Sequence, residues 1–312
     1  MMRLAPHICF VFLDGVGLAP PGIHNPLSQA DMPCLRKLLG RPLVTGPVVD
    51  RPGLLFRPLD ARLGVDGLPQ SATGQTALLT GVNAVAQVGR HLSAYPPPSL
   101  QEILASHSIL KQVADAGLSA TFANAYTSTY WQHVQERRLR HSVTTWANLA
   151  AKLPFRDLGD LARGEAVYWD ITHRFMREHL GLKQLPLIEP QEAGRRLAIL
   201  TTYYHFVLFE SFLPDLLGHR RLDKSPETIL RILDGFFWGL LTYLPENATV
   251  VISSDHGNVE DDSVRTHTAN PVPLIVVGPG SQAFRKATAI TDVTPAILDW
   301  LTNNSSRNGW RR

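Results

Sequence analysis

The sequence predicts an α/β protein with a doubly wound, mostly parallel sheet. Continuous apolar runs typical of buried strands alternate with amphipathic stretches typical of helices, and polar residues follow several of the runs directly. The 312 residues, of which 44% are hydrophobic, can form a sizeable core with a smaller added domain. Such sheets bind ligands at the carboxyl ends of their strands, so the residues after the apolar runs are the first candidates for a site.

The expected elements follow one another along the chain. The first strand is the apolar run 8–13, which ends at Asp14 and Gly15. Further strands are expected at 118–123, 205–209, 249–253 and 273–277. Helices are expected at 31–39, 71–79, 99–117, 226–243 and 292–301. This alternation predicts helices on both faces of the sheet.

The chain is expected to divide into a discontinuous core and an insertion. Residues 1–94 and 201–302 are assigned to the α/β core. Residues 95–200 are mostly of helical pattern, with Trp and Arg interleaved, and are predicted to form a small, largely helical inserted cap. The polar residues 303–312 are predicted to be a disordered tail.

Charge and composition argue against several classes of protein. The net charge of +3 is small, and the basic residues are spread along the chain, unlike those of a nucleic-acid-binding protein. No apolar stretch reaches the roughly 18 residues that a membrane span needs, and the run 8–13 is too short for a signal peptide. Cys9 and Cys34 form neither a disulfide framework nor a metal knuckle. We expect a cytoplasmic protein that binds neither nucleic acid nor membrane, and the sequence favours no oligomeric state.

Six carboxylate or imidazole groups lie at the predicted strand ends or in the loops beside them. They are Asp14, Asp215, His219, Asp255, His256 and His267. This mixture is typical of Zn²⁺ or Mn²⁺ sites and is too rich in nitrogen for Ca²⁺ or Mg²⁺. Each residue alone has an ordinary structural explanation, such as a turn or a helix cap. Their joint occurrence predicts a metal site.

A second candidate element is the segment 67–77, in which Gly, Ser and Thr precede a predicted helix. Small residues let the backbone approach a phosphate closely, and the start of a helix favours an anion. A serine hydroxyl becomes an effective nucleophile when a divalent metal contacts it, which makes Ser71 a candidate. The alternative is that Ser71 or Thr73 simply caps the helix.

Together these motifs resemble the metalloenzyme core of cofactor-independent phosphoglycerate mutase and of phosphopentomutase, two branches of the alkaline phosphatase superfamily. The segments that carry the resemblance are 12–17, 215–219, 254–258 and 267–273, in the order found in the family. The serine segment 71–82 is similar to that of alkaline phosphatase itself. The resemblance covers about 1–90 and 205–302 and implies an alkaline-phosphatase-like fold.

The resemblance also implies two divalent metal ions, Mn or Zn. One ion would be held by Asp215, His219 and His267. The other would be held by Asp14, Asp255, His256 and the hydroxyl of Ser71. Two ions roughly 3.5–4 Å apart would clamp a phosphate, and Ser71 would attack it and become a phosphoserine.

The acceptor in the second step would decide the activity. Transfer to water would make the protein a phosphatase, and transfer to another substrate hydroxyl would make it a phosphomutase. The short cap and the serine segment slightly favour hydrolysis of a small phosphate monoester. A phosphomutase of the phosphopentomutase or phosphoglycerate mutase type, and an inactive metal-binding protein, are the alternatives. Those mutases carry a His shortly after the nucleophile, where this chain has Gly74 and Gln75. The motif that follows the nucleophile in sulfatases is absent after Ser71, which argues against a sulfatase.

Basic residues near the serine segment and in the predicted cap are candidates for binding the substrate phosphate. They are Arg90, His91, Arg137, Arg138 and Arg140. The last three belong to the run 136–141, which is also typical of a solvated helix end.

Overall fold

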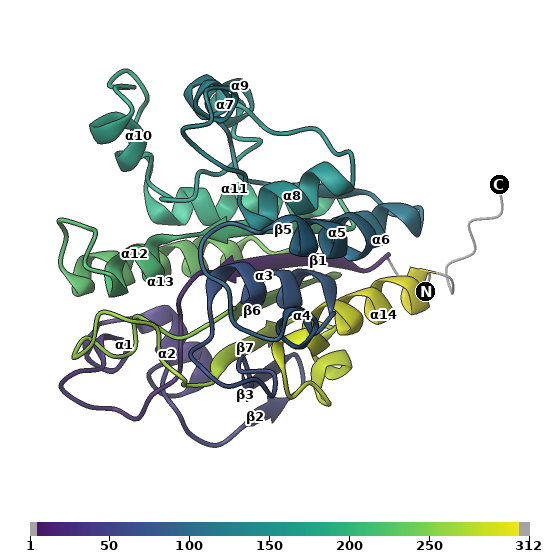
Figure 1. The fold of residues 1–312 in the computed structure, drawn as a ribbon. Coiled ribbons are helices and arrows are strands. Elements are labelled where there is room, and N and C mark those ends of the chain that lie inside the picture. Colours follow the sequence, from purple (N-terminus) through teal and green to yellow (C-terminus); the bar gives the residue numbers. More distant parts are fainter. Residues whose placement is uncertain (1–4, 306–312) are drawn as a thin grey trace.

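A seven-stranded sheet forms the centre of the protein in the computed structural model, which describes residues 5–305 (Figure 1). The strands are β1 (His7–Leu13), β2 (Val49–Arg51), β3 (Leu54–Leu59), β4 (Ala120–Phe122), β5 (Phe206–Ser211), β6 (Ala248–Ser254) and β7 (Val272–Val277). Their order across the sheet is β2-β3-β7-β6-β1-β5-β4. The neighbours β6, β1, β5 and β4 are parallel, whereas β7, β3 and β2 are added by antiparallel pairing. The predicted α/β class with a mostly parallel sheet is confirmed.

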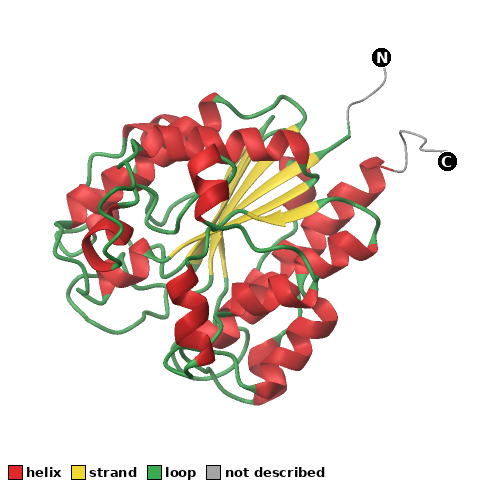
Figure 2. Cartoon of the chain, turned by 90° about the horizontal axis from the view of Figure 1, so that it is seen from above, coloured by secondary structure: helices red, strands yellow, loops and turns green. Residues whose placement is uncertain are grey.

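Helices cover both faces of the sheet (Figure 2) because successive side chains of a strand point to opposite faces. In β1, Cys9 and Val11 belong to one hydrophobic cluster, and Ile8 and Phe10 belong to the other. The first cluster contains side chains of α1 (Pro26–Gln29), α2 (Pro33–Leu39), α11 (Pro190–Tyr203), α12 (Leu213–Gly218) and α13 (Pro226–Thr242). The second contains side chains of α3 (Ser71–Thr80), α4 (Ala84–Val88), α5 (Pro98–His107), α6 (Ile109–Asp115), α8 (Val143–Ala150) and α14 (Val293–Ser305).

The five strands expected from apolar runs are all present, and the structure adds β2 and β3. The sequence of β3 contains Arg57 and Pro58, which shorten its apolar run and obscure the strand pattern. Pairing with β7 makes it a strand, with Leu54 opposite Val277 and Leu59 opposite Val272. A tertiary contact thus supplies what the local pattern lacks.

The inserted part is smaller than the predicted cap 95–200. The strand β4 lies within that range, yet it pairs in parallel with β5 and is the edge strand of the sheet. The helices α5 and α6 before it, and α11 after the insertion, pack in the two helical layers. The elements outside these layers are α7 (Ser128–Gln135), α9 (Leu158–Arg163) and α10 (Arg174–His179), seen together at the top of Figure 1. We infer a cap of about residues 124–142 and 151–189, with α8 and the ranges 98–123 and 190–203 in the core.

Two further expectations differ from the structure. The predicted helix 99–117 is divided at Ser108, whose hydroxyl caps α6 by accepting a hydrogen bond from the Lys111 N–H at 3.3 Å. The last helix, α14, continues to Ser305, so residues 303–305 of the predicted disordered tail are helical. Residues 306–312 lie outside the described part of the chain. Between residues 5 and 305, no helix has both the length and the apolar character needed to cross a membrane.

Candidate metal centre

The candidate metal ligands meet at the carboxyl ends of the central strands. The last residue of β1, Leu13, lies opposite the last residues of both β5 and β6. Asp14 follows β1 directly, and Asp255 and His256 follow β6 directly. Asp215 lies in the first turn of α12, shortly after β5. Parallel pairing therefore places side chains from distant parts of the chain at one edge of the sheet.

The three histidines of the centre turn Nε2 toward the carboxylates because Nδ1 faces a backbone carbonyl. Nδ1 of His219, His267 and His256 lies 3.0, 2.9 and 3.4 Å from the carbonyl oxygens of Arg265, Pro69 and Gly257, respectively. A ring that donates its Nδ1–H to a carbonyl keeps its lone pair on Nε2, which is the form that binds a metal. The Nε2 atoms of the three rings therefore point into the same small volume.

Asp215, His219 and His267 form the first group. Oδ1 of Asp215 lies 3.3 Å from Nε2 of His219 and 3.6 Å from Nε2 of His267. The two Nε2 atoms lie 3.1 Å from each other. Two lone pairs and a carboxylate oxygen this close repel one another unless a positive charge lies between them. The donor set fits a divalent cation such as Mn²⁺ or Zn²⁺.

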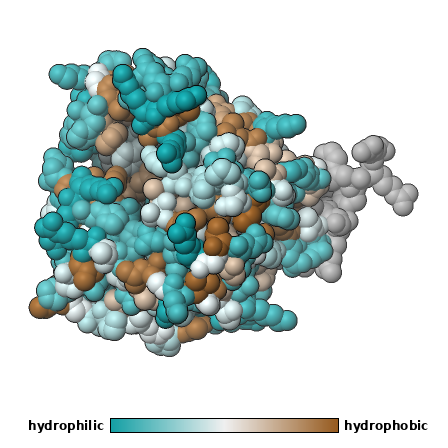
Figure 3. Space-filling view, in the orientation of Figure 1, coloured by the Kyte–Doolittle hydropathy of each residue, from teal (hydrophilic) through white to brown (hydrophobic). Residues whose placement is uncertain are grey.

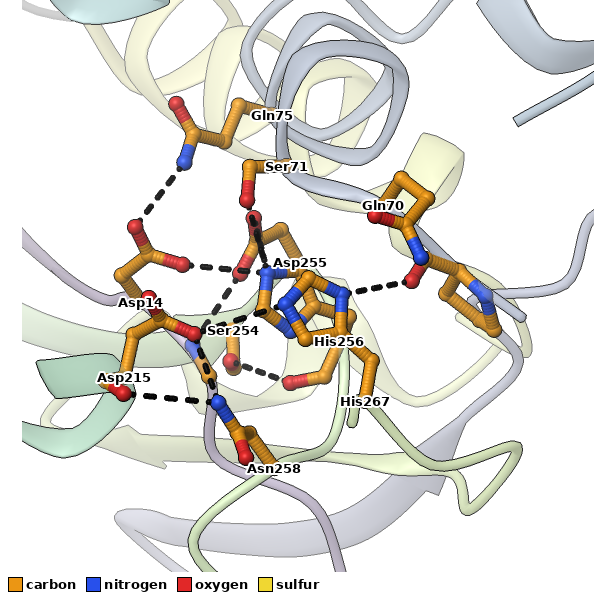
Figure 4. A network of polar contacts seen from close by, with 12 residues as sticks. Asp14, Gln70, Ser71, Gln75, Asp215, Ser254, Asp255, His256, Asn258 and His267 are labelled. Atoms are coloured by element: carbon orange, nitrogen blue, oxygen red, sulfur yellow. Dashed lines mark hydrogen bonds and ion pairs between the residues drawn. The ribbon is translucent and has the colours of Figure 1, made fainter. Parts of the chain in front are cut away.

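Asp14, Asp255, His256 and Ser71 form the second group (Figure 4). Nε2 of His256 lies 3.2 Å from Oδ1 of Asp14, 3.4 Å from Oδ2 of Asp255 and 3.0 Å from the hydroxyl of Ser71. Oδ1 of Asp14 and Oδ2 of Asp255 are buried, and neither has a hydrogen-bond partner in the described part of the chain. Unpaired buried carboxylate oxygens are costly, and a bound cation would satisfy them. These residues therefore also fit a metal ion.

The electrostatics of the centre reflect its crowding with carboxylates. Burial raises the pKa of Asp14, with a further contribution from Asp215, and burial with repulsion from Asp14 raises the pKa of Asp255 well above its usual value. Burial disfavours a charged His256, yet the adjacent Asp255 and Asp14 raise the pKa of its ring to about 10. Burial likewise opposes ionisation of Asp215, but His267 and His256 lower its pKa to about 2. The excess of negative charge favours cations.

Amide side chains orient two of the carboxylates. Nε2 of Gln75 donates to Oδ2 of Asp14 at 3.2 Å, and Nδ2 of Asn258 donates to Oδ1 of Asp215 at 2.8 Å. Such contacts around a metal site fix the direction of the ligand oxygens. Gln75, noted in the sequence for replacing a His of the mutases, thus holds a candidate ligand in place.

Glu260 joins the loops that carry the ligands and is a residue that the sequence analysis missed. Its buried carboxylate accepts hydrogen bonds from the backbone N–H of Gly17 at 2.9 Å and of Asn258 at 2.8 Å. It also accepts from the amide of Asn270 at 3.1 Å and from the hydroxyl of Thr268. In the sequence, only the position of Glu260 two residues after the motif 254–258 could have indicated this role. A single Glu in a loop matches no known motif.

Ser71 is the first residue of α3, and its hydroxyl faces the centre. Gln70, at the N-cap, makes no side-chain cap, which leaves the positive end of the helix open to an anion. The hydroxyl of the alternative residue, Thr73, instead accepts from the Leu92 N–H at 3.1 Å. A Cβ on Gly74 would lie 2.8 Å from the carbonyl oxygen of Asp255, so glycine is what lets α3 approach the centre closely.

A cavity of about 470 Å³ opens beside Ser71, Asp14 and Asp215. Figure 3 shows a hollow at the left of the molecule, below the part formed by α7, α9 and α10, with apolar side chains in its depth. Arg140 and Arg221 are among its lining residues. The other predicted phosphate-binding residues, Arg90, His91, Arg137 and Arg138, do not belong to the described lining. Arg221, which the sequence analysis did not select, comes from the loop after α12.

Part of the chain is similar in sequence to known proteins. Residues 193–304 match the sequence profile of the Metalloenzyme superfamily. The chain is 30% identical to 2,3-bisphosphoglycerate-independent phosphoglycerate mutase from Acetivibrio thermocellus over 106 residues, which are 31% of the chain. A match of 28% identity over 103 residues, 30% of the chain, is found to the same enzyme from Clostridium kluyveri. Each match spans 20% of the length of that relative.

Similarity to solved structures extends over almost the whole chain. A protein from Pyrococcus horikoshii has a TM-score of 0.59 at 14% identity, covering 100% of this chain and 99% of its own. Alkaline phosphatase from the Antarctic bacterium TAB5 has a TM-score of 0.53 at 12% identity, covering 96% of this chain and 99% of its own. At identities this low, structural similarity shows the fold alone. The similarity confirms the predicted alkaline-phosphatase-like fold. Residues 193–304 thus match the Metalloenzyme superfamily, and the chain as a whole has a fold similar to that of alkaline phosphatase.

Proposed function

We propose that the protein is a two-metal phosphoryl-transfer enzyme that hydrolyses a small phosphate monoester through a phosphoserine at Ser71. One observation carries the proposal: the hydroxyl of Ser71 lies at the open N-terminus of α3, 3.0 Å from Nε2 of His256, on the wall of a cavity. A nucleophile, a cation-binding cluster and space for a substrate thus adjoin one another. This arrangement is what a phosphoryl-transfer enzyme requires.

The residues of the two groups would hold the ions. Asp215, His219 and His267 would bind one, and Asp14, Asp255, His256 and the Ser71 hydroxyl would bind the other. When bound, the ions would supply the positive charge that stabilises the transferring phosphate and favours the ionised serine hydroxyl. The choice between Mn and Zn, like the cytoplasmic location, stays a prediction of the sequence.

The proposed reaction has two steps. The Ser71 oxygen attacks phosphorus and loses its proton, the bond from phosphorus to the ester oxygen breaks, and the alcohol leaves with a proton. Water then attacks the phosphoserine, which releases inorganic phosphate and restores the Ser71 hydroxyl. The open end of α3 contributes its positive field to the anionic phosphate in both steps.

Hydrolysis is favoured over mutase activity by two features of this chain. Gln75 carries a non-titratable amide, which is engaged with Asp14 and cannot exchange a proton with a bound substrate. The inserted part is also small, whereas a mutase must enclose its intermediate and exclude water. A phosphomutase remains the second candidate, because the matching curated relatives are phosphoglycerate mutases. The complete set of ligands and nucleophile argues against an inactive metal-binding protein.

The test is ³¹P NMR of the Mn- or Zn-loaded protein with pentose phosphates, phosphoglycerates and simple alkyl phosphates. Free phosphate is the expected product, and movement of the signal to a new ester position would establish a mutase instead. The variant Ser71→Ala should lose turnover while keeping its fold and most of its metal. Ser106→Ala, an exposed serine in α5, is the matched control and should keep full activity. Full activity of Ser71→Ala would show that another group is the nucleophile.

A further inference from the structure

We propose that the cavity beside Ser71 binds the alcohol part of the phosphate ester and selects alcohols that carry an aromatic ring. This inference rests on the proposed function of the same site and adds the class of substrate. A cavity of about 470 Å³ lies within the roughly 300–1,000 Å³ typical of pockets for small organic molecules. It has room for a ring-bearing alcohol whose phosphate lies at Ser71.

Aromatic side chains make up much of the cavity wall. They come from the end of β4, from α7 and the loop before it, from the loop before α10, and from the residue after β5: Phe122, Tyr126, Tyr130, Tyr168, Trp169 and Phe212. The rings also pack on one another, with centroids 4.7 Å apart for Tyr126 and Tyr130 and 5.8 Å apart for Trp169 and Phe212. Edge-to-face packing of this kind holds ring faces and edges in position for another ring.

Two of the tyrosine hydroxyls in this wall already have protein partners. The Tyr126 hydroxyl lies 2.7 Å from the hydroxyl of Thr145, and the Tyr130 hydroxyl lies 2.9 Å from Nδ1 of His141. A substrate with several hydroxyls, such as a sugar phosphate, would bury those hydroxyls that face ring carbons without hydrogen bonds, which is unfavourable. An aromatic alcohol would replace water against the same ring carbons with a favourable free energy.

Glu210 adds a buried polar group to this wall, beside other polar lining residues such as Asn124 and Ser142. Its side chain is 1% exposed, one carboxyl oxygen accepts from the Thr144 hydroxyl, and the other has no hydrogen-bond partner in the described part of the chain. Burial raises the pKa of Glu210 well above its usual value. The oxygen of Glu210 that lacks a partner can form a hydrogen bond with one polar atom of a mainly apolar ligand.

The test compares 2-phenylethyl phosphate with ethyl phosphate on the metal-loaded enzyme. Both release a primary alcohol, so the chemical step differs little and the comparison reports binding of the ring. Burial of the ring predicts that kcat/KM for the phenylethyl ester is higher by about tenfold or more. In Trp169→Ala this preference should fall about fivefold. Trp238→Ala, a partly exposed tryptophan of α13 outside the cavity lining, should keep the full preference.

A second measurement keeps the inference testable without turnover. Phenylphosphonate should bind the metal-loaded protein about tenfold more tightly than methylphosphonate in titration calorimetry. Equal kcat/KM for the two esters, or equal affinity for the two phosphonates, would overturn the inference and leave the proposed function standing. Tighter phenylphosphonate binding with no turnover of either ester would support the aromatic site and overturn the proposed hydrolysis.

Discussion

Replacing Glu260 with Gln should destabilise the fold and loosen the metal centre. The carboxylate accepts from the Gly17 and Asn258 N–H groups on Oε2, and from the Thr268 hydroxyl and the Asn270 amide on Oε1. The amide nitrogen of Gln can replace one of these oxygens. It fits better on the Thr268 side, because the hydroxyl can rotate and accept, but the hydrogen bond from Asn270 is then lost. The remaining bonds also lose their charge assistance.

The expected loss follows from these contacts. One hydrogen bond to a buried charged group contributes about 1.5–3 kcal/mol, and weakening of the other three adds to this, so we expect a loss of about 2–4 kcal/mol in the free energy of unfolding. Urea unfolding of the metal-free protein, followed by tryptophan fluorescence, measures it. Metal affinity, measured by titration calorimetry, should fall about tenfold, because Glu260 joins the loops that carry the ligands.

The matched control is Glu246→Gln, which removes the same charge at an exposed position. It should change the free energy of unfolding by less than about 0.5 kcal/mol. A loss below about 1 kcal/mol in Glu260→Gln, together with unchanged metal affinity, would refute the assignment of Glu260 as the residue that holds these loops together.

Three further predictions concern the centre itself. Asp255→Asn should lower metal affinity at least about tenfold, measured as metal per chain after dialysis, and an unchanged metal content would remove Asp255 from the ligands. Asp115→Asn, an exposed acid of α6, is its control. Chelation should abolish turnover, and added Mn²⁺ or Zn²⁺ should restore it; failure of both ions would contradict the two-metal reading. Gly74→Ala should raise the activation free energy of turnover and lower the free energy of unfolding by about 1–3 kcal/mol each, because the new Cβ would lie 2.8 Å from the carbonyl oxygen of Asp255. Wild-type kinetics would show that α3 can move away freely.

The aromatic wall of the cavity and the candidate metal centre are formed largely by different parts of the chain. The ligands lie on the loops after β1, β5 and β6, whereas the ring wall comes largely from the inserted residues around α7 and α10. If both proposals hold, substitutions in the ring wall should change the preferred alcohol without changing the candidate metal ligands.

The sequence by itself determined the α/β class, the five apolar strands and the set of candidate ligands with Ser71. These features are local: a buried strand is a continuous apolar run, and a ligand beside a strand end is visible as Asp14 after 8–13 or as Asp255 after 249–253. The resemblance then supplied the pairing of ligands into two groups, because no local pattern relates residues about 240 positions apart.

Tertiary structure alone decided the rest. It converted 54–59 into a strand through pairing with β7, and it moved β4 from the predicted cap into the sheet through pairing with β5. It also selected Glu260 as the link between the loops, and Arg140 and Arg221 rather than Arg90 as arginines that line the cavity containing Ser71. The physical reason is common to all of them. Each role depends on which distant groups a side chain meets, and that is fixed by strand pairing and loop packing rather than by the residues next to it in the chain.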